Sequence, residues 1–166
     1  MDTIRAERFN PERTSWQQIH GDVLSIERQQ FGEGAFDDEY LREVFEDPES
    51  VAVLLLAGDS ARVVGFTCAV PEGKLDPERE AESDETAHIV DTVIEASYQG
   101  RGLIGQLMSV LERELRDAGY WYLEREAAVT NGYAATIDRA YTGRIIERKG
   151  PYESEWGLQV FFRIRL

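Results

Sequence analysis

The sequence predicts an α/β protein in which one mixed, mostly antiparallel sheet of six or seven strands carries helices on both faces. Apolar, β-branched runs are interspersed with amphipathic helical stretches. Two of the apolar runs are joined by a short turn, and the chain finishes in consecutive strands instead of repeating strand–helix–strand units. With 166 residues and 42% hydrophobic content, a single domain over residues 1–166 is expected.

The N-terminal third predicts one strand and two helices. Residues 3–9 alternate charged residues with small or apolar ones, as an edge strand does. Asn10 and Pro11 are typical of a helix start, and an apolar stripe at helical spacing continues that helix to about residue 30 through Trp16, Ile19, Val23 and Ile26. Asp37 is expected to cap a second helix that stops before Pro48.

The rest of the chain continues with strands, broken by two further helices. Residues 51–57 and 62–71 predict a hairpin, and the acidic residues 72–86 predict a loop. Strand, helix, strand, helix and two strands follow over residues 88–96, 102–118, 120–129, 132–141, 144–149 and 158–166, the last two placed around Gly150-Pro151. The element order is therefore β-α-α-β-β-β-α-β-α-β-β.

Charge and cysteine content exclude several function classes. The net charge is −14, and Lys74 and Lys149 are the only lysines beside 16 arginines, so nucleic acid is not an expected partner. The acidity fits either a solvated surface or attraction of cationic amine substrates. Cys68 is the single cysteine; it excludes an internal disulfide and predicts a small buried hydrophobe, and no metal site is expected.

No feature of the sequence predicts membrane association. The longest wholly apolar run, Val51 to Ala57, is far shorter than the ~20 residues that a membrane-spanning helix needs. The first residues show no basic segment leading into an apolar one. A cytoplasmic location is the expectation, and a homodimer is possible.

The stretch "YQGRGLIGQLM", residues 98–108, contains a glycine pattern of nucleotide-binding proteins. Gly100, Gly102 and Gly105 spell G-x-G-x-x-G, the dinucleotide fingerprint. That fingerprint should follow its strand almost directly, but "EASYQ" separates Gly100 from the apolar run that ends near Ile94. Glu124, about 20 residues further on, is the one feature that favours it. An NAD-binding protein is therefore a remote alternative.

The same stretch is suited to hold a pyrophosphate at the start of a helix. Gly100 and Gly102 let a phosphate approach the main chain without a Cβ in the way. The N–H groups of the first helical turn and the helix dipole favour an anion there. Arg101 adds a positive charge in an acidic protein.

Residues 88–108 resemble the central motif of the GNAT superfamily of acyl-CoA-dependent N-acyltransferases. In that family an apolar strand is followed by a short turn and then by Q/R-x-x-G-x-G/A at a helix start; Gln99 to Leu103 match, and the sixth position is Ile104, with Gly105 one place later. The resemblance implies acetyl-CoA, or another acyl-CoA, as cosubstrate. It implies coenzyme contacts from Val93, Ile94, Gln99, Gly100, Arg101, Gly102, Leu103, Ile104, Gly105 and Asn131.

The resemblance also implies catalytic residues. "TNGYAATIDRAY" looks like the family's N-x-x-A helix motif through Asn131 and Ala134, with a tyrosine about one turn later than usual. Tyr141 would then protonate the departing thiolate, and Tyr133 is the other candidate. The general base is expected to be His88, with Asp91 as runner-up.

The predicted function is therefore N-acetyl transfer to a primary amine of a small molecule or peptide. In this family the acceptor is selected by two segments that correspond here to Phe31–Phe36 and Gly150–Trp156. A catalytically silent acyl-CoA-binding or interaction module on the same fold is the alternative.

Overall fold

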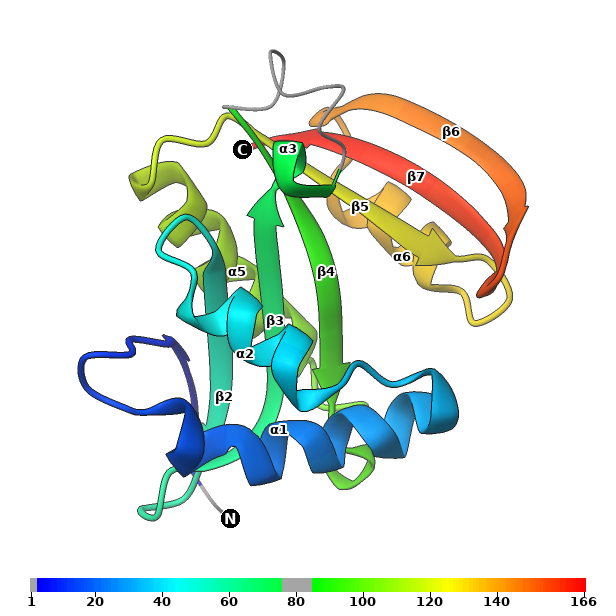
Figure 1. Ribbon diagram of the computed structural model, residues 1–166. Helices are drawn as coiled ribbons and strands as arrows, with labels where there is room; N and C mark the ends of the chain where they lie inside the picture. The colour runs from blue at the N-terminus through cyan, green and yellow to red at the C-terminus, as the bar shows by residue number, and fades with distance from the viewer. Residues whose placement is uncertain (1–2, 76–84) are drawn as a thin grey trace. The chain divides into compact units, whose positions relative to one another are not determined.

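The computed structural model describes residues 3–75 and 85–166, and its elements follow the predicted order (Figure 1). They are β1 (Ile4–Arg8), α1 (Trp16–Phe31), η1 (Gly32–Gly34), α2 (Asp38–Glu46), β2 (Val51–Ala57), β3 (Arg62–Pro71), α3 (Glu72–Leu75), β4 (Thr86–Ile94), η3 (Ala96–Tyr98), α5 (Leu103–Asp117), β5 (Tyr122–Ala128), α6 (Tyr133–Ala140), β6 (Ile145–Ser154) and β7 (Gly157–Arg165).

The strands form a seven-stranded sheet in the order β1-β2-β3-β4-β5-β7-β6. Strands β4 and β5 pair in parallel, whereas the β1–β2, β2–β3, β5–β7 and β6–β7 pairs are antiparallel. This confirms the predicted mixed, mostly antiparallel sheet. The chain forms two compact units: unit 1 comprises residues 1–70 and 90–114, and unit 2 comprises residues 71–89 and 115–166.

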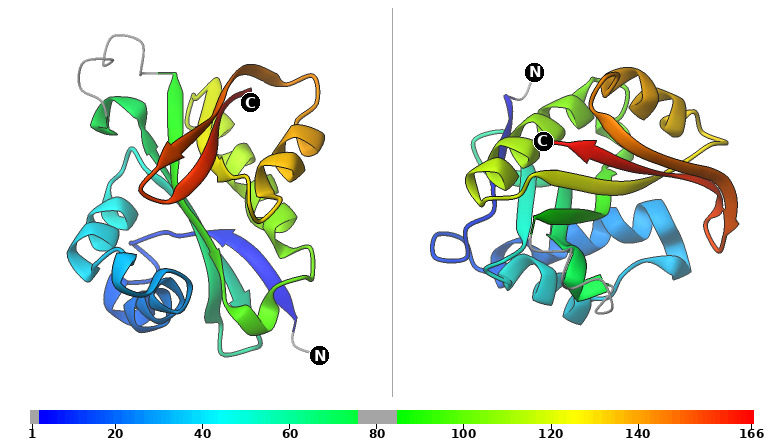
Figure 2. Two further views of the ribbon diagram at one scale, coloured as in Figure 1. Left: turned by 90° about the vertical axis from the view of Figure 1, so that its right-hand side faces the viewer. Right: turned by 90° about the horizontal axis from the view of Figure 1, so that it is seen from above.

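In unit 1, helices cover both faces of the sheet. Helices α1 and α2 lie on one face and α5 lies on the other (Figures 1 and 2). Every residue of β2 is buried, which explains its unbroken apolar sequence, because a strand covered on both faces has no polar side. The core against α1 and α2 includes Trp16, Val23, Leu41, Phe45, Leu54, Phe66 and Val93.

The start of α1 differs from the sequence prediction. The helix begins at Trp16 instead of Pro11, because the Ser15 N–H donates to Gln18 Oε1 at 2.8 Å. This S-x-x-Q capping box was the signal missed. Asn10 closes a separate turn, with its side-chain oxygen accepting the Glu12 N–H at 2.9 Å. The predicted cap of α2 is confirmed: Asp37 Oδ1 accepts the Tyr40 N–H at 2.9 Å.

In unit 2, α6 packs on β5 and β7 around a second core. That core comprises Ala127, Ala134, Ile137, Tyr141, Val160, Phe162 and Ile164. The last hairpin turns at residues 155–156, not at Gly150-Pro151 as predicted. Strand β6 runs through Gly150-Pro151 because its pairing with β7 shifts register between Lys149 and Tyr152, and an edge strand tolerates such an irregularity.

Two further observations concern the helices. Residues 72–75 of the predicted acidic loop are helical, and residues 76–84 of it lie outside the described residues. In the described part of the chain, no helix combines the length and apolar character needed to cross a membrane.

Gly65 of β3 marks a point where two strands leave no room for a side chain. A Cβ there would stand 2.9 Å from the Val93 carbonyl oxygen and 3.0 Å from Leu55 Cδ1. We expect Gly65→Ala to lower the free energy of unfolding by about 1–3 kcal/mol. Gly21 lies on the exposed face of α1, and beyond its own helix no described residue lies within 4 Å of where its Cβ would stand. Gly21→Ala should therefore raise the free energy of unfolding by about 0.5–1 kcal/mol. Urea denaturation measures both, and equal effects would contradict this account of the β3–β4 packing.

Candidate active site

The glycine loop adopts a backbone conformation that suits glycine at two of its three positions. Gly100 and Gly102 have φ of +74° and +72°, a region that favours glycine. Apart from its chain neighbours, no described residue comes within 4 Å of where a Cβ would stand on either glycine. Gly105 lies inside α5 without a positive φ. The loop therefore leaves open space beside the main chain that leads into α5.

The first turn of α5 offers main-chain donors without an opposing charge. The first N–H groups of a helix have no partner within it, and no acidic residue occupies the first turn of α5. The Leu103 side chain is buried, whereas Ile104 is 39% exposed. An anion at this helix start would therefore be bound by main-chain groups.

Two guanidinium groups flank the ring of Tyr98, just before the loop. The Arg101 guanidinium lies 4.9 Å from the ring centroid and that of Arg62 lies 5.7 Å from it. Arg101 also donates to the Ser97 carbonyl at 2.8 Å, and Arg62 pairs with Glu95 at 2.6 Å. The hydrogen bond from Arg62 lowers the pKa of Glu95. Two guanidinium groups therefore lie beside the loop, one of them paired with Glu95.

The Gln99 side chain connects the loop to the end of β4. Its Nε2 donates to the Ile94 carbonyl at 2.9 Å and lies 3.4 Å from Gln30 Oε1. The neighbouring Ala96 N–H donates to Gln29 Oε1 at 3.0 Å. Val93 and Ile94 are buried, so a ligand would contact their main chain and not their side chains. The end of α1 thus contacts the turn that follows β4, and Gln99 connects that turn to the end of β4.

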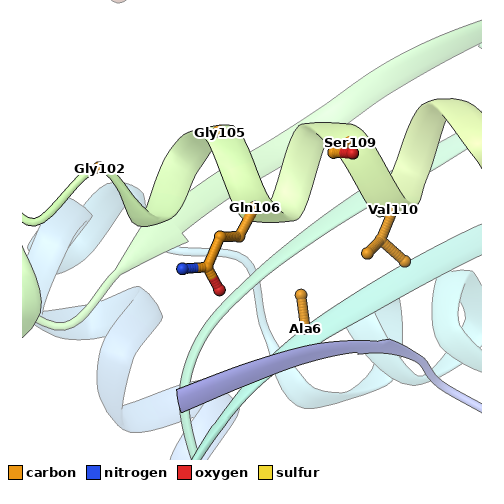
Figure 3. Close-up of a pocket in the computed structure, with 6 residues that line it drawn as sticks. All are labelled: Ala6, Gly102, Gly105, Gln106, Ser109 and Val110. Carbon is orange, nitrogen blue, oxygen red and sulfur yellow. The ribbon is translucent and has the colours of Figure 1, made fainter. Parts of the chain in front are cut away.

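An open hollow lies beside the loop in unit 1 (Figure 3). It has a volume of about 480 Å³ and is lined by Ala6, Gly102, Gly105, Gln106, Ser109 and Val110. The Gln106 and Val110 side chains extend from α5 on the side where Ala6 of β1 lies (Figure 3). Both glycines border this space, so part of the surface next to the loop is unfilled.

The environment of Asp91 on β4 argues against its candidacy as general base. Its side chain is buried, Oδ1 accepts the Thr92 N–H at 2.8 Å, and the carboxyl group interacts with Glu27 of α1. Burial first, and then the hydrogen bond and charge of Glu27, raise the pKa of Asp91 to about 9. Asp91 is therefore protonated at neutral pH and engaged inside unit 1.

His88, in unit 2, lies beside a buried carboxylate. It pairs in register with Glu124 of β5, and its Nδ1 is 3.7 Å from Glu124 Oε2. Glu124 also lies 3.8 Å from Arg163 Nε, and Arg163 in turn donates to Thr86 Oγ1 at 3.0 Å. The His88 side chain is 21% exposed, so it remains accessible.

The two candidate acids differ in environment. Tyr141, next after α6, is 5% exposed in the core of unit 2, with the Arg144 guanidinium 5.2 Å from its ring centroid. The Tyr133 hydroxyl accepts a 2.7 Å hydrogen bond from Arg125. Asn131 Oδ1 accepts the Tyr133 N–H at 3.0 Å and so supports the start of α6.

The predicted acceptor segments contain both exposed and packed aromatic residues. Phe31 is 39% exposed and Trp156, at the β6–β7 turn, is 54% exposed. Phe36 instead stacks on Tyr40, with ring centroids 4.6 Å apart, and Tyr152 hydrogen-bonds to Glu126. Phe36 and Tyr152 are therefore held by neighbours within their own units.

The structure groups the predicted residues by unit. Unit 1 contains Asp91, Val93, Ile94 and the loop residues Gln99–Gly105, and unit 2 contains His88, Asn131, Tyr133 and Tyr141. Sequence reasoning missed Glu27. A carboxylate four residues after Val23 falls on the apolar face of α1, and an acid in that position signals a buried interaction.

Two further observations concern Cys68 and possible metal ligands. Cys68 is fully buried, as expected, and burial raises the pKa of its thiol. Among residues 3–75 and 85–166, no three His, Cys, Asp or Glu side chains are arranged to hold a metal ion.

Comparison with known proteins gives one family match and many similar structures. The family model described as the acetyltransferase (GNAT) family matches residues 16–136. Arabidopsis thaliana NAA60, solved with a bisubstrate analogue, has a TM-score of 0.68 at 14% identity, covering 99% of each chain. The Escherichia coli ribosomal-protein-S18-alanine N-acetyltransferase gives 0.63 at 16% identity, over 100% of this chain and 93% of that one.

A third structure was solved with acetyl-CoA. The putative acetyltransferase YncA of Salmonella typhimurium has a TM-score of 0.67 at 16% identity, covering 100% of this chain and 93% of its own. At these identities the likeness establishes the fold. No curated protein sequence matched the chain significantly.

The protonated Asp91 predicts a pH-dependent stability. Between about pH 4 and 9 the folded chain holds a proton that the unfolded chain has released, because burial raises the pKa of Asp91 from 3.8 to about 9. Rising pH therefore favours unfolding, by up to about 1.4 kcal/mol per pH unit. We expect Asp91→Asn to remove this component, so that the variant loses less stability than wild type between pH 5 and 8. Parallel curves in urea denaturation would contradict the assignment.

Proposed function

The chain belongs to the acetyltransferase (GNAT) family, and from that premise we propose that it transfers an acetyl group from acetyl-CoA to a primary amine. The observation that carries the proposal is the loop before α5. Gly100 and Gly102 have left-handed backbones beside open space, at a helix start without acidic residues.

The loop residues fit the pyrophosphate of coenzyme A. Main-chain N–H groups of Leu103 and Ile104 would bind phosphate oxygens, and Arg101, with Arg62 nearby, would offset the net charge of −14. Gln99 would act indirectly, by holding the loop against the end of β4. The pantetheine arm would contact the main chain of Val93 and Ile94.

The reaction proposed is direct attack of a neutral amine on the thioester carbonyl. The C–N bond forms as the C–S bond breaks, the amine proton passes to a base, and the departing sulfur takes a proton from an acid. A main-chain N–H of β4 would polarise the carbonyl. We assign the acid to Tyr141, whose phenol has a reference pKa of about 10.

We assign the base to His88. Its imidazole is partly exposed, whereas Asp91 is buried and protonated. The Glu124 carboxylate, 3.7 Å from Nδ1, would orient the ring and stabilise the imidazolium that proton transfer produces. A neutral imidazole is the side chain most often used as a general base.

The acceptor is proposed only as a class. A net charge of −14 favours approach of cationic, amine-bearing molecules over anionic ones. The solved Escherichia coli enzyme is named for an alanine of ribosomal protein S18; that peptide acceptor is one member of the class to test, beside small amines.

A two-part experiment tests the function. Acetyl-CoA should raise the melting temperature, and a panel of primary amines should then release free coenzyme thiol from it. A melting shift without thiol release from any amine would favour the silent binding module. No shift with acetyl-CoA, or a shift with NAD alone, would contradict the proposal.

Gly102→Ala tests the loop directly. A Cβ at φ +72° places carbon beside the main chain where the pyrophosphate would bind. We expect acetyl-CoA affinity, measured by calorimetry, to fall at least about tenfold, equivalent to about 1.4 kcal/mol. Gly119→Ala is the matched control, because Gly119 has φ +95° at the end of α5 and an equally open surrounding. If both variants bind as wild type does, the loop assignment is wrong.

Tyr141→Phe tests the acid. Removing the hydroxyl should lower kcat by about 100-fold, the smaller end of the range for acid–base catalysis, while acetyl-CoA affinity changes little. Tyr133→Phe, which removes only the hydroxyl bonded to Arg125, should retain turnover. Undiminished turnover in Tyr141→Phe would transfer the role to Tyr133 or to water.

A further inference from the structure

Glu27 of α1 has a buried carboxyl group that reaches the connection to α2. The residue is 1% exposed, and its Oε1 accepts the main-chain N–H of Phe36 at 3.0 Å. The connection, residues 32–37, is otherwise open at its first part, where Gly32, Glu33 and Gly34 are exposed. Glu27 therefore anchors the C-terminal end of the exposed segment 32–37 through a buried hydrogen bond to Phe36.

The Glu27 carboxyl group also forms a buried pair with the carboxyl group of Asp91. Glu27 Oε2 and Asp91 Oδ2 are both fully buried, and no N–H or O–H of any other described residue donates to either. The two carboxyl groups interact with each other. Two acids in hydrogen-bond contact must hold a proton between them, because two bare carboxylates repel.

Asp91 is itself held firmly on β4. Its Oδ1 accepts the Thr92 N–H at 2.8 Å, and its carbonyl accepts the Thr67 hydroxyl of β3 at 2.9 Å. Thr67 is fully buried. The chain of contacts from β3 through Asp91 and Glu27 to Phe36 thus links a rigid sheet to an exposed segment.

The remaining titratable groups around the pair stay neutral over the working pH range. Burial raises the pKa of Cys68 on β3 and of Tyr40 on α2, and the electrostatic interaction of each with Asp91 raises it further. The surrounding contacts are otherwise those of Thr92, Thr67 and the Phe36 main chain. The carboxyl pair is therefore the group whose charge changes.

We propose that Glu27 and Asp91, sharing one proton, are positioning residues that hold the segment 32–37 beside β4 and thereby set the affinity for the acceptor amine. This inference rests on the proposed function. The amine must reach the thioester near Val93 and Ile94, and Asp91 precedes these residues on the same strand. A segment anchored to Asp91 stands next to that approach.

The kinetic test compares two substitutions at Glu27. Glu27→Ala removes the acceptor of the Phe36 N–H and should raise KM for the amine about tenfold, with kcat and acetyl-CoA affinity within about threefold. Glu27→Gln should stay near wild type at neutral pH, because its amide oxygen accepts the Phe36 N–H and its NH₂ donates to Asp91. Glu43→Gln, an exposed residue of α2, is the matched control for the lost charge.

Hydrogen exchange tests the positioning role without any activity. The Phe36 amide should exchange at least about tenfold faster in Glu27→Ala than in wild type, and remain protected in Glu27→Gln and Glu43→Gln. Its exchange in wild type should accelerate as pH rises beyond the intrinsic pH dependence, as the shared proton is lost. Glu27→Gln should lack that additional acceleration.

The outcomes separate this inference from the proposed function. If wild type turns over no amine but Phe36 protection follows the predicted pattern, the anchor stands and the function fails. If Glu27→Ala weakens acetyl-CoA binding as much as amine binding, or if Phe36 exchanges equally in wild type and in Glu27→Ala, the positioning role is overturned. Should Glu27→Ala not fold, the wild-type and Glu27→Gln exchange profiles decide; coincident profiles refute the shared proton.

Discussion

The structure depends most on how the main chain passes from β4 into α5. Between Ile94 and Leu103 the chain leaves a buried strand, makes a short 3-10 turn and enters a helix through two left-handed residues, Gly100 and Gly102. Gln99 ties the turn back to the Ile94 carbonyl. The path exposes main-chain groups at a helix start, which is where an anionic ligand gains most from fixed N–H donors.

About one turn of helix α1, residues 27–30, contacts both this passage and the proposed acceptor side. Gln29 and Gln30 contact Ala96 and Gln99, while Glu27 contacts Phe36 and Asp91. In the proposed mechanism, coenzyme and amine are therefore positioned from a single element. The polar residues that do this lie near the end of a helix whose apolar face packs into the core of unit 1.

Local rules were sufficient for the element order, the sheet class and the glycine loop. Apolar periodicity and the cap at Asp37 are local signals, so they are readable without a structure. The start of α1 and the last hairpin were wrong because Ser15 competes with Asn10 as a cap, and because pairing with β7 carries β6 through Gly150-Pro151. The position of the last hairpin turn depends on long-range pairing between β6 and β7, which no local sequence pattern reveals.

The candidate site was predictable where main-chain geometry matters and not where buried side chains meet. Gly100 and Gly102 were identified from spacing, and the structure gives both a left-handed backbone. The Glu27–Asp91 pair joins residues 64 positions apart, so its proton and its effect on the Asp91 pKa follow only from the fold. The grouping of Arg62 with Arg101 around Tyr98 is equally non-local.

The most direct test of the central claim is an NMR titration of the ¹⁵N-labelled protein with coenzyme A. The account predicts that the amide signals of residues 100–104 shift saturably and more than those of the rest of α5, since their N–H groups would bind the pyrophosphate. Saturable binding of coenzyme A that leaves these amides unmoved would contradict it.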